Sequence, residues 1–180
     1  MPHTWDTTGG ESFSVEELAQ RVCGIAGIEG VTFLGGEPFD QADALANLAM
    51  QIRAAGLSVV TFTGYQLESL VKIEGAQRLI DATDLLIDGP FVESQADFAR
   101  PWIGSTNQRY HCVTARYASL SGQFQSIPNR LELRIAQDGQ LALNGLATSS
   151  TIRELLAAVT HVDAVSSDET TTKEYRCARS

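Results

Sequence analysis

Three short loops contain the residue types from which a ligand site could be built. They read Gly35-Gly36-Glu37-Pro38, Thr63-Gly64-Tyr65 and Asp88-Gly89-Pro90, and each follows a short run of apolar and β-branched residues. Ligands of open or barrel-like parallel sheets bind at the carboxyl ends of the strands. We therefore expect the three loops to converge at one edge of a sheet.

The first loop offers the most chemistry. Gly35 and Gly36 carry no Cβ, so a ligand can approach the backbone there and hydrogen-bond to it. Glu37 is then the first charged group beyond the strand, and its carboxylate can accept from an ammonium or a hydroxyl group. The same residues also suit a plain turn, in which Pro38 starts a helix and Glu37 favours the helix N-terminus. Both interpretations stay open.

The other two loops are less specific. Asp88 could accept from a ribose diol, but an Asx turn before Gly89 is the more common role of such a residue. Tyr65 could stack on a base or cover the rim of the sheet. The first loop is neither GxGxxG nor a P-loop, because it lacks the required Lys and Ser/Thr.

The residues alone predict no metal ligand and no catalytic nucleophile. Histidines and cysteines are scattered along the chain, at His3, His111, His161, Cys23, Cys112 and Cys177. This spacing makes no disulfide framework and no CxxC metal knuckle. His111 and Cys112 are adjacent and would point to opposite faces of a strand, so one ion could not easily use both.

Strand and helix patterns alternate up to Pro90. Buried strands are expected at 31–34, 57–62 and 84–88. Ser14 caps a helix before the first of them, Asp40 is expected to cap the second helix, and a helical stretch with a break at Gly75 follows. This alternation predicts right-handed βαβ units and a parallel sheet.

The pattern changes after Pro90. Residues 91–109 are polar and irregular, whereas 131–135 alternate with period 2 and turn through Asp138-Gly139 into 141–143, which predicts a hairpin. Another capping box, beginning at Thr151, is expected to open a short final helix. Residues 163–180 carry few large apolar groups, which favours a loose tail.

Composition narrows the class of protein. The 180 residues include 43% hydrophobic residues and carry a formal net charge of −9, which suits a globular domain with a real core. The sequence has no Lys/Arg cluster of the kind that binds nucleic acid. It has no apolar run long enough for a membrane span, and no secretory signal is visible. We expect a soluble cytoplasmic protein that binds neither nucleic acid nor membrane.

Five segments together resemble one family, the radical S-adenosylmethionine activating proteins. The resemblance is strongest to the small activating protein of anaerobic ribonucleotide reductase. In chain order, the segments are residues 2–6 (PHTWD), 30–41 (GVTFLGGEPFDQ), 61–65 (TFTGY), 84–91 (DLLIDGPF) and 102–109 (WIGSTNQR). An ordered set of this kind is far more specific than GGEP alone.

The resemblance implies a fold and a division of the chain. The fold would be α/β, a partial (β/α) radical-SAM-type barrel of parallel strands whose first strand is missing, with a C-terminal β-hairpin and a short helix. Residues 1–115 would form the truncated barrel domain, 116–162 the hairpin-plus-helix extension and 163–180 the tail.

The resemblance also implies chemistry. In this family a CxxxCxxC loop holds a [4Fe–4S] cluster, and a low-potential electron donor reduces it. The cluster cleaves S-adenosylmethionine to a 5′-deoxyadenosyl radical, which activates a glycyl-radical enzyme such as anaerobic ribonucleotide reductase. Gly35, Gly36, Glu37 and Pro38 would hold the methionyl amino group, and Asp88 would belong to the ribose or carboxylate environment. The family's Lys after Asp-Gly is replaced here by Pro90.

The sequence departs from the family in lacking CxxxCxxC. In the family this motif immediately precedes the stretch matched by residues 2–6, so we expect an N-terminally truncated product that does not cleave S-adenosylmethionine reductively. One alternative is a cluster-free module that binds S-adenosylmethionine or a partner protein. Another is a radical enzyme that modifies a peptide or small molecule.

Overall fold

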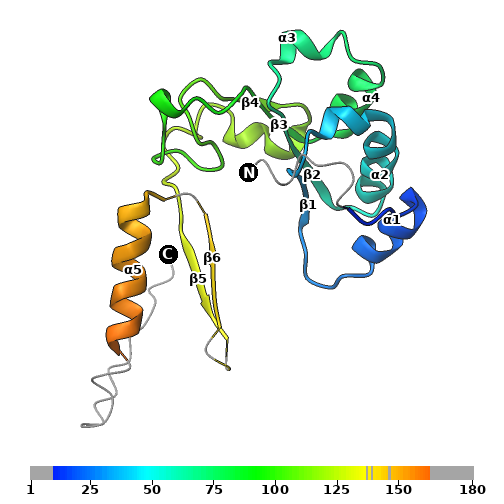
Figure 1. Cartoon of the computed structure of the whole chain (residues 1–180). Helices are drawn as coiled ribbons and strands as arrows, with labels where there is room; N and C mark the ends of the chain where they lie inside the picture. The colour runs from blue at the N-terminus through cyan, green and yellow to red at the C-terminus, as the bar shows by residue number, and fades with distance from the viewer. Residues whose placement is uncertain (1–9, 137, 139, 146, 163–180) are drawn as a thin grey trace.

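A four-stranded mixed sheet is the centre of the molecule (Figure 1). The computed structural model describes residues 10–136, 138, 140–145 and 147–162. In the sheet, neighbouring strands follow chain order: β1 (Gly30–Phe33), β2 (Ser58–Phe62), β3 (Leu85–Asp88) and β4 (Arg109–Cys112). The first three are parallel, and β4 is antiparallel to β3. The α/β class and the parallel strands are confirmed, whereas the radical-SAM barrel stays a prediction.

Helices α1, α2 and α4 cover one face of this sheet. Their bounds, with those of the shorter helices, are α1 (Val15–Cys23), η2 (Pro38–Gln41), α2 (Ala42–Ala54), α3 (Leu67–Leu70), α4 (Ala76–Ala82), η3 (Glu93–Gln95) and η4 (Ala115–Leu120). Apolar residues of α1, α2 and α4 share a core with β1 and β2, including Ala19, Ile52, Ala82 and Val59. Ser14 caps α1 as predicted, since its side chain accepts from the backbone N–H of Glu17.

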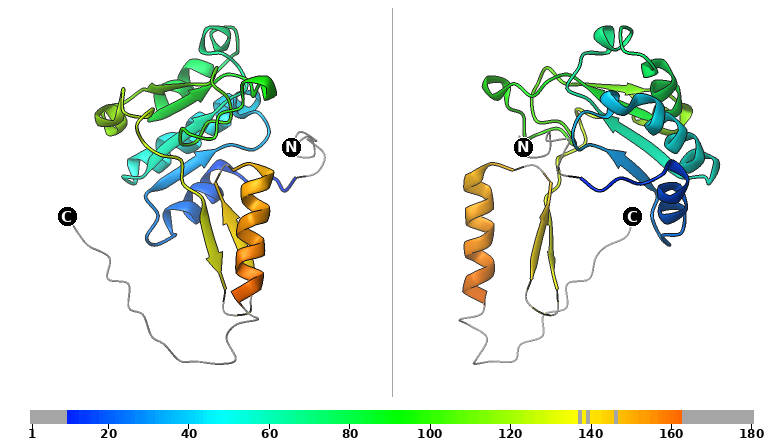
Figure 2. Two further views of the ribbon diagram at one scale, coloured as in Figure 1. Left: turned by 90° about the vertical axis from the view of Figure 1, so that its left-hand side faces the viewer. Right: turned by 45° about the vertical axis from the view of Figure 1, so that its right-hand side comes forward.

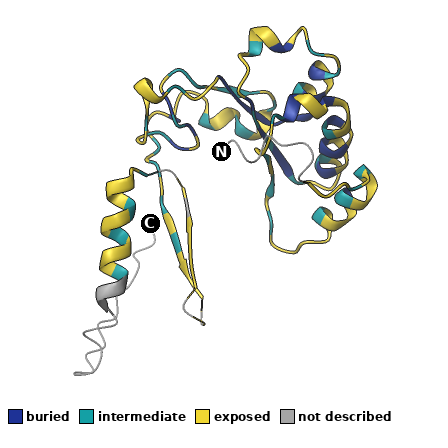
Figure 3. Cartoon of the chain, in the orientation of Figure 1, coloured by how far each residue is buried: buried dark blue, intermediate teal, exposed yellow. Residues whose placement is uncertain are grey.

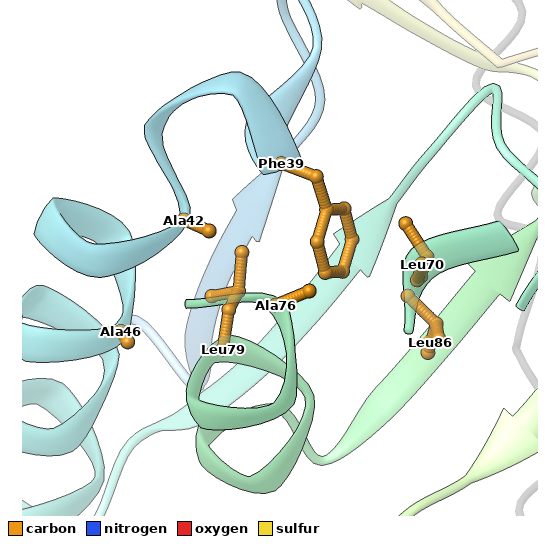
Figure 4. Packing of buried hydrophobic residues seen from close by; sticks show 7 residues of the cluster. All are labelled: Phe39, Ala42, Ala46, Leu70, Ala76, Leu79 and Leu86. Carbon is orange, nitrogen blue, oxygen red and sulfur yellow. The ribbon is translucent and has the colours of Figure 1, made fainter. Parts of the chain in front are cut away.

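Directly beneath the glycine-rich loop, Phe39 anchors a second part of this core. Figure 4 shows its ring among Leu70, Leu79 and Leu86, with alanines from α2 and α4 alongside. Phe39 is 1% exposed. Small alanine side chains allow the helices to lie close, and the Phe39 ring fills the remaining space. The buried ring therefore anchors the chain two residues after Glu37.

The other face of the sheet is covered by residues from the second half of the chain. Leu85 and Ile87 of β3 pack there against Ile103 and Phe124. Tyr110 stacks on Phe124 with 4.3 Å between ring centroids. All four residues of β3 are buried, because helices lie on one side of it and this layer on the other.

Two predicted caps were wrong. Asp40 lies inside η2, whose N-cap is Glu37, and α2 begins after Gln41. The final helix, α5 (Ser149–Val162), begins before Thr151, because the hydroxyl of Thr148 accepts from the backbone N–H of Thr151. The break at Gly75 is confirmed: this glycine has φ 75° and separates α3 from α4.

The C-terminal elements stand away from the sheet (Figures 1 and 2). They are a hairpin of β5 (Glu132–Ile135) and β6 (Leu141–Asn144), as predicted, followed by α5. Figure 3 shows these elements as mostly exposed, unlike the dark centre of the sheet. The division of the chain at 115–116 stays a prediction, and the expected tail at 163–180 and the motif at 2–6 lie outside the described residues. None of the described helices is both long and apolar enough to cross a membrane.

Candidate functional site

Hydrogen bonds join the three predicted loops at one edge of the sheet. The carboxylate of Glu37 accepts from the hydroxyl of Thr63 at 2.8 Å and from the backbone N–H of Gly64 at 2.9 Å. The backbone N–H of Gly89 donates to the carbonyl of Tyr65 at 2.8 Å. The loop after β2 is therefore the bridge between the loops after β1 and β3, and the predicted convergence is confirmed.

Glu37 has a local role as well. Its side chain accepts from the backbone N–H of Phe39 at 3.1 Å and so caps η2, with Pro38 as the first helical residue. This is the turn interpretation that the sequence left open. An ionised carboxylate offers about four lone-pair positions. Three protein groups donate to the carboxylate of Glu37, so one lone-pair position remains for a ligand.

The two glycines differ in what they contribute. Gly36 has φ 64°, a left-handed conformation that favours glycine. A Cβ on Gly35 would meet nothing within 4 Å. Space is therefore open beside the backbone of Gly35, as a ligand approaching this loop requires, while Pro38 is buried beneath it.

Asp88 lies at the end of β3 and is fully buried. Its carboxylate accepts from the backbone N–H of Leu67 at 2.7 Å and pairs with the guanidinium of Arg109, and Nε2 of His111 lies 3.0 Å away. Burial raises the pKa of Asp88, but the nearby His111 ring and the hydrogen bonds from Arg109 and Leu67 outweigh it and hold this pKa well below its usual range. Asp88 thus joins β3, β4 and α3, and its assignment to a ribose or carboxylate environment stays a prediction.

Arg109 extends this network to the surface. Its guanidinium makes two hydrogen bonds to the carboxylate of Glu68, at 2.9 and 2.8 Å. These bonds lower the pKa of Glu68 to about 2. Fork-to-fork pairing of this kind is geometrically specific, so Arg109 sets the position of α3 relative to β4.

Two side chains from the segment 102–109 fasten it to the loop after β3. Nδ2 of Asn107 donates to the carbonyl of Pro90 at 2.7 Å, and Nε2 of Gln108 donates to the carbonyl of Gly89 at 3.0 Å. Oε1 of Gln108 accepts from the N–H groups of Gly104 and Ser105. Sequence reasoning did not assign these roles. The available signal was the run of long polar side chains at 107–109, in a part of the chain that is otherwise a loop.

Tyr65 lies at the rim of the site, 39% exposed. With Phe39, Ile73 and Glu74 it lines an open hollow of about 470 Å³ beside η2. An exposed ring next to open space is compatible with both interpretations of this residue, as a base-stacking platform and as a cover for the sheet rim.

The described residues do not fit an iron–sulfur cluster. Among them, no group of three or more His, Cys, Asp or Glu side chains could hold a metal ion. Cys23 is exposed at the end of α1, while Cys112 is half-buried and donates to the carbonyl of Tyr117. Burial raises the pKa of the Cys112 thiol. His111 faces Asp88 and Cys112 packs on the other face of the sheet, as their adjacency predicted.

Comparison with known proteins places the chain in a family. The model of a family described as "4Fe-4S single cluster domain" matches residues 1–111. The chain belongs to this family. The match includes β1 to β3, all three loops and most of β4, and it ends before the hairpin and α5. No solved structure matches the chain.

Curated relatives carry one name, anaerobic ribonucleoside-triphosphate reductase-activating protein. That of Vibrio cholerae is 29% identical over 122 residues, which are 62% of this chain and 76% of the relative. That of Salmonella typhimurium is 30% identical over 117 residues (60% and 74%), and that of Escherichia coli K12 is 28% identical over 116 residues (60% and 74%). The resemblance to these activating proteins is confirmed, whereas the cluster in the family's description has no ligand set among the residues that the structure describes.

Proposed function

We propose that this protein binds S-adenosylmethionine at the loop edge of the sheet and acts on an anaerobic ribonucleotide reductase, as its relatives' names indicate for them. The observation that carries the proposal is the carboxylate of Glu37. Protein donors hold it at the open end of the glycine loop, with one lone-pair position left for an ammonium group.

The two ends of the ligand would meet different parts of this edge. The amino group would bind to Glu37, beside the open backbone of Gly35 and above the buried Pro38. The ribose or carboxylate end would lie toward the end of β3. There Asp88 would act from beneath the surface by holding Arg109 and the N-terminus of α3 in place.

Binding of S-adenosylmethionine is distinct from its cleavage, which in the radical S-adenosylmethionine proteins requires a cluster. A [4Fe–4S] cluster supplies the electron for reductive cleavage and is itself reduced by a low-potential donor. The described residues offer no ligands for it, and Cys23, Cys112 and Cys177 are far apart in the sequence. We therefore propose that these 180 residues bind S-adenosylmethionine without cleaving it. The second candidate function is a module that binds S-adenosylmethionine without acting on a reductase, and the lack of cluster ligands among the described residues favours it.

Calorimetric titration of S-adenosylmethionine into the iron-free protein tests binding. We expect saturable heat for the wild type and at least a tenfold weaker dissociation constant for Glu37→Gln, because hydrogen bonds to charged groups are worth about 1.5–3 kcal/mol. Glu16→Gln, an exposed change in the first turn of α1, is the matched control and should bind as the wild type does. A folded wild-type chain that gives no heat would refute the proposal.

Two further measurements separate the candidates. Size-exclusion chromatography with the anaerobic ribonucleotide reductase of Vibrio cholerae should show co-elution, and separate elution would remove the reductase from the proposal. Anaerobic incubation with iron and sulfide should leave the protein without bound cluster. Incorporation of about four irons per chain would show that these residues do assemble a cluster.

A further inference from the structure

We propose that Thr63 is a positioning residue, which orients the Glu37 carboxylate for a ligand's ammonium group. The inference deepens the proposed function and rests on it. Thr63 is 5% exposed and lies immediately after β2, one strand away from the loop that carries Glu37. A buried hydroxyl at such a place needs partners, and the identity of those partners determines what it does.

The direction of the Thr63 hydroxyl is determined by its two neighbours. The backbone N–H of Tyr65 donates to Oγ1 of Thr63 at 3.1 Å, so this oxygen is already an acceptor. An ionised carboxylate can only accept. The hydroxyl proton must therefore point to Oε1 of Glu37, 2.8 Å away. The resulting chain runs from Tyr65 through Thr63 to Glu37.

The two oxygens of Glu37 are held unequally, and the difference assigns the ligand position. Oε1 accepts twice, from the backbone N–H of Phe39 and from Thr63. Oε2 accepts once, from the backbone N–H of Gly64 at 2.9 Å. The remaining lone-pair position is thus on Oε2, next to the exposed Gly64. An ammonium group would bind there.

Gly64 provides an independent check on that assignment. A Cβ added to Gly64 would have Oε2 of Glu37 as its neighbour, at 3.6 Å. This is an ordinary contact, and Gly64 has no left-handed φ, so alanine is compatible with the fold here. The added methyl group would nevertheless occupy space beside Oε2 without removing the backbone donor.

The test compares two ligands and three variants. S-adenosylmethionine carries the ammonium group, whereas 5′-deoxy-5′-methylthioadenosine retains the nucleoside and lacks it. We expect Thr63→Val to weaken S-adenosylmethionine binding about tenfold, Thr63→Ser to restore it to within about twofold, and Gly64→Ala to weaken it severalfold. The dissociation constant for methylthioadenosine should stay within about twofold of the wild-type value in all three, with thermal denaturation reporting folding.

The outcomes distinguish this inference from the proposed function. If Thr63→Val binds S-adenosylmethionine like the wild type while Glu37→Gln does not, the inference is wrong and the proposed function stands. If Thr63→Val weakens both ligands equally, Thr63 has only a structural role and the inference is again overturned. A wild-type chain that binds no S-adenosylmethionine would remove the proposed function and this inference with it.

Discussion

The loop edge of the sheet and the C-terminal elements differ in how their residues are held. At the loop edge, side chains from distant parts of the chain bond to one another: Glu37 to the loop after β2, and Asp88 to α3 and β4. Among the described residues of the C-terminal elements, side-chain hydrogen bonds join near neighbours in the sequence, such as Arg134 with Glu132 and Arg153 with Ser149.

Burial follows the same division. Every residue of β3 is buried between two layers. In the hairpin, the cross-strand pairs Leu133–Leu143 and Ile135–Leu141 lie on one face, and Ile135 is 62% exposed. A two-stranded hairpin is marginally stable by itself. The family match ends before these elements, so the part of the chain shared with the family is also the part stabilised by long-range contacts.

The largest expected effect is on the buried centre. Leu86→Ala should lower the free energy of unfolding by about 3–4 kcal/mol, because it removes a fully buried side chain and leaves a cavity. The matched change Leu143→Ala, at a side chain that is 37% exposed, should cost less than about 1 kcal/mol. Urea unfolding followed by circular dichroism gives both values. Equal losses would mean that the hairpin is as well packed as the sheet.

The network at Asp88 should make stability depend on pH. Asp88→Asn should lower the free energy of unfolding by about 2–3 kcal/mol at pH 7, since charge-assisted hydrogen bonds are lost while Arg109 keeps Glu68. The pKa of Asp88 is lower in the folded than in the unfolded chain. Its stabilising contribution is therefore complete above about pH 5 and decreases as the pH falls below about 4.

Urea unfolding of wild type and Asp88→Asn between pH 3 and pH 7 measures this dependence. The two curves should converge as the pH falls. A constant difference across the range would show that the carboxylate charge does not stabilise the fold.

Helix caps allow the two regions to be compared with one kind of substitution. Ser14→Ala removes the cap of α1, which packs in the core, and should cost about 1 kcal/mol in global stability. Thr148→Ala removes the corresponding cap of α5. It should reduce helix content with little change in the urea midpoint of the sheet. A shift of the sheet's midpoint as large as that of Ser14→Ala would indicate that α5 is coupled to the core.

The smallest effect is expected at the exposed hairpin. Ile135→Lys should change the free energy of unfolding by no more than about 0.5 kcal/mol, because the side chain is already largely in water. Thermal denaturation of the variant and the wild type would measure it. A large loss would mean that this aliphatic face is covered in solution.

The parts of the fold that could be predicted follow local patterns. Runs of apolar residues predicted β1, β2 and β3. Because these strands are parallel, the loops that follow them were expected at the same edge of the sheet. The sequence left the start of η2 open, since a helix beginning at Pro38 behind Glu37 and a cap at Asp40 were both suitable, and only the folded loop selects Glu37. β4 was not among the predicted strands, because its four residues, Arg109–Cys112, are mostly polar.

The partners of the site residues were still less predictable. Asp88 meets Arg109 and His111 only because β4 runs antiparallel beside β3 and pairs Asp88 with Arg109. Likewise, the contact of Thr63 with Glu37 joins residues 26 positions apart. Sequence patterns identify a loop whose residues suit ligand binding. The hydrogen bonds that orient its side chains depend on how distant strands and loops pair in the folded chain.

The most direct test of the central claim is a backbone amide NMR titration of the iron-free protein with S-adenosylmethionine. The amide signals of Phe39 and Gly64, which both donate to Glu37, should shift with saturation, together with those of Gly35 and Gly36. The signals of β5, β6 and α5 should stay unchanged. Absence of shifts at the loop edge, or shifts concentrated in the C-terminal elements, would contradict the account.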